Sequence, residues 1–144
     1  MKPLSPCLLV LVVMASCGQA QEAPEAARVR DLVAADRLDE ALALARDWTL
    51  SRPSELEGLT IYARLQTQMG QYQGAVDSLD SAWFLTRDPQ MLVDKGLVCL
   101  EWGRPADAAQ AFREALRHND SCAPAHAGLA RMMLEAGDHA EALI

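Results

Sequence analysis

The 144-residue chain has few aromatic side chains, few β-branched runs and a shortage of basic residues. Aromatic residues make up 5% of the chain, and Ala is its commonest apolar residue. Because Ala has the highest helix propensity and strands favour β-branched residues, this composition favours an all-α fold. The net charge is −7. A nucleic-acid binder needs Lys and Arg to release counterions, so we expect no nucleic-acid partner.

Residue patterns that carry catalysis or metal binding are also scarce. The three histidines, His118, His126 and His139, have no Cys–Cys or His–Glu–His spacing beside them of the kind that binds zinc. The sequence has no Gly-rich phosphate loop and no Gly-x-Ser-x-Gly motif. We therefore expect no enzyme activity, no cofactor, no metal site and no small-molecule substrate.

The first 20 residues have the pattern of an export signal. Lys2 supplies a positive start, residues 8–14 are an unbroken apolar run, and small residues follow. The apolar run is shorter than the roughly 20 residues that a membrane-spanning helix needs. The sequence therefore predicts a signal peptide over 1–20, with either of two processing sites.

One site is cleavage after Ala20, which would give a soluble periplasmic protein. The other is Cys17, because the residues 14–17, MASC, resemble a bacterial lipobox. This resemblance implies that Cys17 becomes the lipidated first residue. The residues that follow it, 18–24, are expected to form a flexible tether. Gly18 in place of Asp implies, by the same resemblance, sorting to the periplasmic face of the outer membrane. We favour the lipoprotein interpretation.

The body of the chain contains an internal repeat. Four alanines are separated by 34, 33 and 34 residues: Ala41, Ala75, Ala108 and Ala142. Five residues before each alanine stands a residue that tolerates a turn: Asp36, Gly70, Gly103 and Gly137. Apolar residues follow at four and seven positions after the alanine: Ala45, Leu79 and Phe112, then Trp48, Ala82 and Ala115. This spacing gives each helix one apolar stripe.

At these positions the sequence resembles the tetratricopeptide repeat family. The third unit matches best, at Gly96, Gly103, Ala108, Phe112 and Ala115. The resemblance implies a right-handed α-solenoid of antiparallel helix hairpins, about three and a half units long. The solenoid covers residues 22–144, with units near 22–55, 56–88, 89–122 and an incomplete 123–144. Because the last unit stops early, we expect a sequence truncated at its C-terminus.

The repeat predicts eight helices, two in each unit. Their expected ranges are 24–35, 38–50, 55–69, 72–86, 89–102, 105–118, 123–136 and one that begins at 139. The three tryptophans, Trp48, Trp83 and Trp102, are expected to pack within or between hairpins. Cys99 and Cys122 are expected about 15 Å apart along the helix axes, too far for a disulfide, which needs Cα atoms within about 7 Å.

The resemblance also implies a working surface. In this family the first helix of each hairpin lines a concave groove, which here holds arginines beside small and aliphatic residues. The groove residues are expected to be Arg30, Val33, Thr60, Arg64, Thr67, Val93, Leu97, Leu100, Arg131 and Leu134. Because Arg binds carboxylates bidentately, they predict a partner segment with acidic and apolar side chains. The alternative is that these arginines are solvated or pair with Glu57, Glu101 and Glu135.

The predicted function is a protein–protein interaction scaffold or adaptor in the bacterial cell envelope. Its partner would be another envelope protein or a peptide segment, and a lipid anchor would hold it at the membrane. The groove lacks the Lys and Asn of the family's chaperone-tail clamp, so that function is not transferred. The alternative is a docking arm of a larger enzyme whose catalytic domain lies beyond residue 144.

Overall fold

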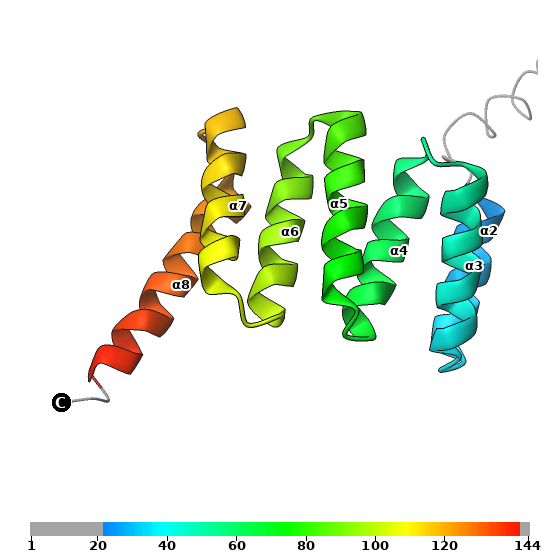
Figure 1. The fold of residues 1–144 in the computed structure, drawn as a ribbon, viewed down its shortest axis with the longest axis horizontal. Helices are drawn as coiled ribbons and strands as arrows, with labels where there is room; N and C mark the ends of the chain where they lie inside the picture. Colours follow the sequence, from blue (N-terminus) through cyan, green and yellow to red (C-terminus); the bar gives the residue numbers. More distant parts are fainter. Residues whose placement is uncertain (1–21, 142–144) are drawn as a thin grey trace, which may run out of the picture.

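The computed structural model describes residues 22–141, which form seven α-helices and, within that range, no strand (Figure 1). This confirms the predicted all-α fold. The predicted signal peptide, Cys17 and Ala142 lie outside the described residues. The helices are α2 (Pro24–Ala34), α3 (Leu38–Ser51), α4 (Leu56–Gln68), α5 (Tyr72–Thr86), α6 (Pro89–Glu101), α7 (Pro105–His118) and α8 (Ala123–Glu141).

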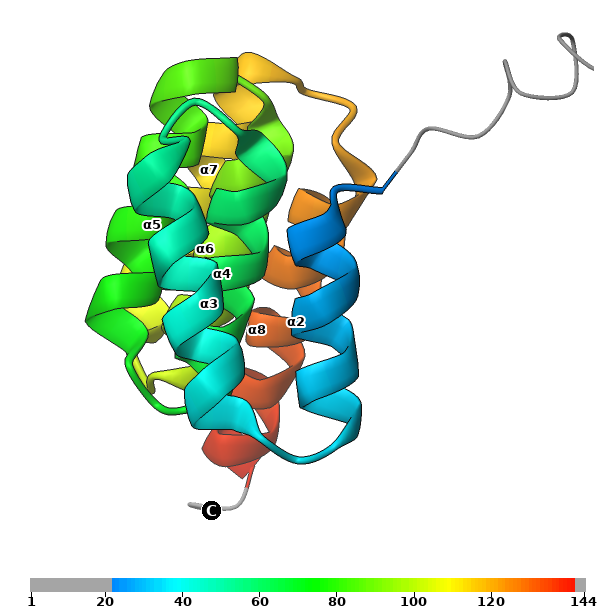
Figure 2. The ribbon, with the colours of Figure 1, turned by 90° about the vertical axis from the view of Figure 1, so that its right-hand side faces the viewer.

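The helices form antiparallel hairpins that stand side by side in a row (Figure 1). The hairpins are α2–α3, α4–α5 and α6–α7, and α8 packs on α7 and α6. The end view shows α2 and α3 in front, with the later helices stacked behind them (Figure 2). Contacts join helices that are next or next but one along the chain, which is the arrangement of a solenoid.

The turn inside each complete hairpin is the same. Asp36, Gly70 and Gly103 have φ angles of 58°, 72° and 77°, in the left-handed region that the repeat pattern predicted for a turn. The N–H of the residue after each one bonds back across the turn, as Arg104 N does to Cys99 O at 2.8 Å. These are Schellman turns, which satisfy the last carbonyls of the preceding helix and reverse the chain.

The alanines of the repeat are packing residues, as predicted. Ala41, Ala75 and Ala108 have no exposed surface. The residues four and seven positions later are buried as well: Ala45, Leu79, Phe112, Trp48, Ala82 and Ala115. The small side chains let the two helices of each hairpin lie close together.

The predicted break at Gly137 is wrong. Helix α8 continues through Gly137 to Glu141, so the structure has no separate helix beginning at 139. Glycine permits a turn but does not require one, and α8 stays helical across Gly137. A Cβ atom added at Gly137 would meet no other atom within 4 Å, so no packing forces the chain to turn there.

The α6–α7 hairpin is joined to α8 by an apolar contact, which we call the glycine joint. Phe112 has no exposed surface and lies between Gly96 of α6 and Gly128 of α8. A Cβ atom at Gly96 would lie 2.5 Å from Cε1 of Phe112, and a Cβ atom at Gly128 would lie 2.6 Å from Cζ of the same ring. The phenyl ring therefore fits only because both glycines lack a side chain.

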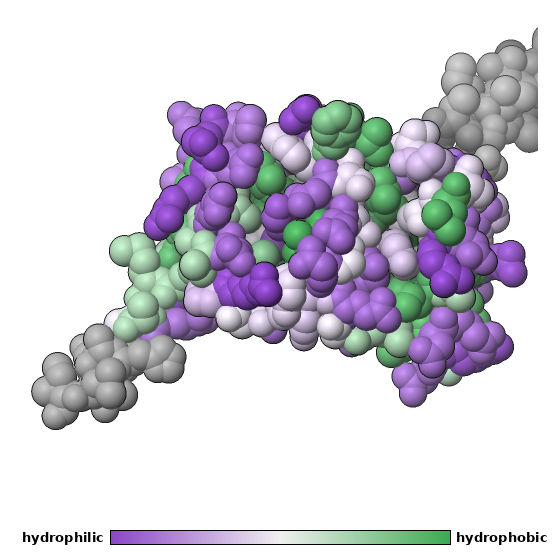
Figure 3. All heavy atoms as spheres, viewed as in Figure 1, coloured by the Kyte–Doolittle hydropathy of each residue, from purple (hydrophilic) through white to green (hydrophobic). Residues whose placement is uncertain are grey.

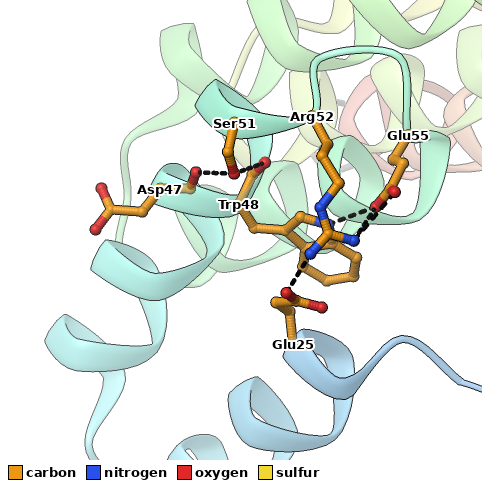
Figure 4. A network of polar contacts seen from close by, with 6 residues as sticks. All are labelled: Glu25, Asp47, Trp48, Ser51, Arg52 and Glu55. Carbon is orange, nitrogen blue, oxygen red and sulfur yellow. Dashed lines mark hydrogen bonds and ion pairs between the residues drawn. The ribbon is translucent and has the colours of Figure 1, made fainter.

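The first hairpin is joined to α4 by polar contacts, which we call the tryptophan joint (Figure 4). Trp48 is 2% exposed, lies against Gly58, and donates its indole N–H to Glu55 at 2.6 Å. Arg52 donates to Glu55 at 3.1 Å and also to Glu25 of α2. The hydrogen bond from Trp48, helped by Arg52, holds the pKa of Glu55 below its ordinary value. One loop thus ties three helices together.

Cys99 and Cys122 are buried free thiols. Burial raises the pKa of the Cys99 thiol, and the carboxylate of Asp107 adds to the effect. A raised pKa keeps the sulfur in its protonated, less reactive form.

Candidate functional site

A cleft of about 350 Å³ lies between α4 and α6, the first helices of the second and third hairpins. This is the face on which the repeat predicted a groove. The cleft combines four predicted groove residues with six that were not predicted. It is lined by Thr60, Ala63, Arg64, Thr67, Gln68, Leu79, Asp94, Leu97, Val98 and Glu101.

The floor of the cleft is apolar. Ala63 of α4, Leu79 of α5 and Val98 of α6 are all buried and line it from three helices. The apolar side chain Leu97 stands higher on the α6 wall and is 39% exposed. An exposed Leu above an apolar floor offers a partner's apolar side chain a place to leave water.

The α4 wall carries two threonines whose hydroxyl protons are already used. Thr60 donates to the carbonyl of Glu57 at 3.0 Å, and Thr67 donates to the carbonyl of Ala63 at 2.9 Å. Both hydroxyls still have oxygen lone pairs to offer. This wall therefore provides acceptors and methyl groups, while its donors come from Arg64 and Gln68.

The two walls carry charges of opposite sign. Arg64 on α4 is exposed and has no ion pair within residues 22–141. Asp94 and Glu101 stand on the α6 wall, and Asp94 accepts a hydrogen bond from Gln90 at 2.8 Å. Neither carboxylate was among the predicted groove residues. They lie three residues before and four after Leu97, and that helical spacing was the available signal.

The three arginines predicted for the groove do not all line the cleft. Arg30 pairs with Glu22 at 2.7 Å, and Arg131 pairs with Glu135 at 3.8 Å on its own helix. Only Arg64 of the three lines the cleft. The other two arginines are exposed, and long exposed side chains pair with nearby carboxylates at little energetic gain.

The remaining predicted groove residues do not line the cleft, and they differ in how far they are buried. The prediction that Val93 contacts a partner is wrong, because it is 1% exposed and belongs to the core; its side chain points inward from α6. Val33 and Leu100 are half-buried and pack against the two core clusters. Leu134 on α8 is 71% exposed and does not line the cleft.

The tryptophans pack as predicted. Trp48 is buried in the tryptophan joint. Trp83 is half-buried with its ring 4.7 Å from that of His118. Trp102 stacks on Tyr72 at 6.1 Å, and the Arg104 guanidinium lies 3.7 Å above its ring.

Two further findings apply to the part of the chain between residues 22 and 141. No group of three or more His, Cys, Asp or Glu side chains there is placed to hold a metal ion. None of the helices described is both long and apolar enough to cross a membrane.

Comparison with a family model identifies a tetratricopeptide repeat at residues 93–144, which begin inside α6. Solved structures have the same fold. One is the second TPR domain of human RPAP3 in complex with an HSP70 peptide, with a TM-score of 0.64 and 14% identity. The alignment covers 76% of this chain and 92% of that domain.

Two bacterial structures are similar over more of the chain. The Yersinia enterocolitica type III secretion chaperone SycD, in complex with a peptide of the translocator YopD, has a TM-score of 0.63 and 12% identity, covering 94% of this chain and 99% of that one. A tetratricopeptide repeat protein from Parabacteroides merdae has a TM-score of 0.68 and 18% identity, covering 93% of this chain and 53% of that one. These findings support the resemblance to the tetratricopeptide repeat family that the sequence indicated. The fold is an all-α helical repeat of that type.

Proposed function

We propose that this chain is a protein-interaction module that holds a short segment of another protein in the cleft between α4 and α6. The observation that carries the proposal is the cleft itself, with an apolar floor between an arginine on one wall and two carboxylates on the other. Two structures of similar fold were solved with bound peptides, one of HSP70 and one of YopD. Those complexes support peptide binding as the mode.

The charges of the cleft define the segment that fits. Arg64 binds a carboxylate of the partner, in line with the acidic segment predicted from the sequence. Asp94 and Glu101 add a requirement that the sequence pattern did not predict, namely a Lys or Arg on the side facing α6. An apolar side chain between these charges reaches Leu97 and the floor. The partner is therefore a short amphipathic segment with charges of both signs.

The module acts in the bacterial cell envelope under this proposal. The support is the export pattern of residues 1–20 and the lipobox-like sequence before Cys17. A lipid on Cys17 holds the protein at the periplasmic face of the outer membrane. Cleavage after Ala20 would instead release a soluble periplasmic protein. A Cys17→Ala change separates the two, because it abolishes membrane attachment only if Cys17 carries the lipid.

Photo-crosslinking tests the cleft. A photoreactive residue at Leu97 should crosslink a partner protein in living cells, and one at Gln110 on α7 should crosslink the same partner weakly or not at all. Mass spectrometry of the crosslinked peptide then gives the bound segment. Equal crosslinking from both positions would place the binding surface elsewhere.

A charge reversal identifies the contact. Arg64→Glu should lower the crosslink yield from position 97 at least several-fold, because the carboxylate of the partner then meets a like charge. Arg113→Glu on α7 is the matched control, since Arg113 is exposed and lies outside the cleft. If both changes leave the yield as it was, Arg64 has no role in binding.

A further inference from the structure

One end of the molecule exposes apolar side chains. Leu50, in the last turn of α3, is 73% exposed; Phe84 and Leu85, in the last turn of α5, are 71% and 48% exposed. Pro53 in the α3–α4 loop lines a hollow with Phe84 and Leu85. Asp80, which also lines this hollow, pairs with Lys95 at 2.7 Å. Apolar surface is seen over the ends of α5 and α3 at the upper edge of Figure 3. We call these four apolar residues the apolar end.

A cation stands beside this apolar surface. Arg87 follows α5 directly, in a left-handed conformation with φ of 54°. Its guanidinium lies 5.2 Å from the ring centre of Phe84 and 5.6 Å from that of Trp83. Aromatic rings with an arginine at their side combine an apolar body with a charged head, a pairing suited to a boundary between water and lipid.

The N-terminus of the solenoid is at the same end. First and second helices are antiparallel, so α2 begins where α3 and α5 finish, and the figures show its start at the upper end (Figures 1 and 2). Six residues separate Cys17 from Pro24. A linker of that length reaches at most about 25 Å. An anchor at Cys17 thus keeps this end close to the bilayer.

We propose that the apolar end rests on the lipid bilayer that holds the acyl chains of Cys17, with Arg87 at the level of the headgroups. The inference depends on the proposed lipid attachment. The helix axes are then perpendicular to the membrane surface, with the protein outside the bilayer. The cleft between α4 and α6 opens parallel to that surface. The net charge of −7 gives no general attraction to anionic lipid, so the contact is made by these side chains together with the anchor.

Fluorescence quenching tests this orientation in the acylated full-length protein. A fluorophore is attached at Ser81→Cys, which lines the hollow beside Phe84, or at Ala136→Cys, an exposed residue about 20 Å along α8 from its start at the same end. Both native thiols of the described chain are buried and should label slowly. The proteins are placed in phosphatidylethanolamine–phosphatidylglycerol vesicles whose lipids carry nitroxides on the acyl chains. Quenching should be several-fold stronger at position 81 than at position 136.

Matched variants identify the side chains that contact the bilayer. Phe84→Ser with Leu85→Ser should reduce the quenching at position 81 to the level at position 136. Met133→Ser with Leu134→Ser, which removes apolar residues from α8 that are 75% and 71% exposed, should leave the quenching at position 81 unchanged. Circular dichroism checks that each variant is folded.

The outcomes separate this proposal from the one on which it depends. Mass spectrometry of the N-terminal peptide reports acylation of Cys17, and its absence overturns the lipid attachment and this orientation with it. Acylated protein with equal quenching at the two positions overturns the orientation alone. Position 81 protected both from nitroxide lipid and from aqueous iodide would show that protein, such as a second copy, covers the apolar end, and this result also overturns the proposal.

Discussion

The glycine joint and the tryptophan joint hold successive hairpins together by different physical means. In the glycine joint, Phe112 of α7 fills the space left by Gly96 and Gly128, with no polar atom involved. In the tryptophan joint, Trp48 also lies on a glycine, Gly58, but a carboxylate and a guanidinium complete the contact. The difference shows that the repeat specifies where hairpins meet, while the chemistry at each meeting point varies.

The two joints differ in how well they tolerate an added side chain at the glycine, and in how their stability responds to pH and salt. At Gly58 a Cβ atom would lie 3.3 Å from the indole of Trp48, a tight contact but not a collision. The tryptophan joint depends on charges near solvent, so it is sensitive to pH and salt. One oxygen of Glu25 is buried without a hydrogen-bond partner among the described residues, which offsets part of the gain. The glycine joint depends on shape alone.

Removing the ring of Phe112 should cause the largest loss. Phe112→Ala leaves a cavity that reaches three helices, and changes of this kind cost about 3–5 kcal/mol. Urea unfolding followed by circular dichroism measures the free energy of unfolding. Phe84→Ala is the control, because Phe84 is 71% exposed and should cost far less. Similar losses for the two variants would show that the glycine joint is not a centre of stability.

Adding one methyl group to the glycine joint should have the next largest effect. Gly96→Ala forces a Cβ atom against the Phe112 ring, and overpacking of a core costs about 1–3 kcal/mol. Phe112→Leu in the Gly96→Ala background should recover part of the loss by making room. The measurement is again the free energy of unfolding.

Gly137→Ala is the matched control for that substitution. Gly137 lies within α8 with open space around it, so Ala should stabilise the helix by up to about 1 kcal/mol. A loss at Gly137 would mean that the residue adopts the turn that the repeat pattern predicted. The two glycines therefore test the packing of α6 and the continuity of α8 in one comparison.

The smallest of these effects should be the pH dependence of the stability that the tryptophan joint contributes. The pKa of Glu55 is lowered in the folded state, so its contribution is present above the ordinary Glu pKa and is lost as the pH falls through the folded value. Wild type should be more stable than Glu55→Gln at neutral pH, and the difference should vanish in acid. Thermal unfolding across pH 3–7, about the range of Glu titration, measures this. A difference that is constant with pH would rule out ionised Glu55 as the source.

The repeat pattern predicted the helices and the packing alanines because both follow from local spacing. It placed six of the seven helices described within a residue or so of their observed ends, and it found Phe112 and Trp48 as packing residues. Its error at Gly137 has a physical cause. A glycine permits a turn but does not require one.

The cleft was harder to predict than the fold. Family positions included Arg64 and Leu97, which line the cleft, but they also included Val93, whose side chain points into the core. They omitted Asp94 and Glu101, because a set of family positions says nothing about neighbours on the same helix face. Ion pairs such as that of Arg52 with Glu25 join residues far apart in sequence, and their choice of partner depends on side-chain conformations that the repeat does not encode.

The reactivity of the two buried thiols, Cys99 and Cys122, reports local unfolding of the solenoid. In the proposed compartment, an exposed thiol would be open to oxidants, whereas Cys99 and Cys122 meet them only when the surrounding helices separate. Cys99 lies within α6 and Cys122 just before α8, so each reports on a different part of the row. Their rates of reaction with a thiol reagent under native conditions would show whether the solenoid frays from its α8 end or opens as one unit.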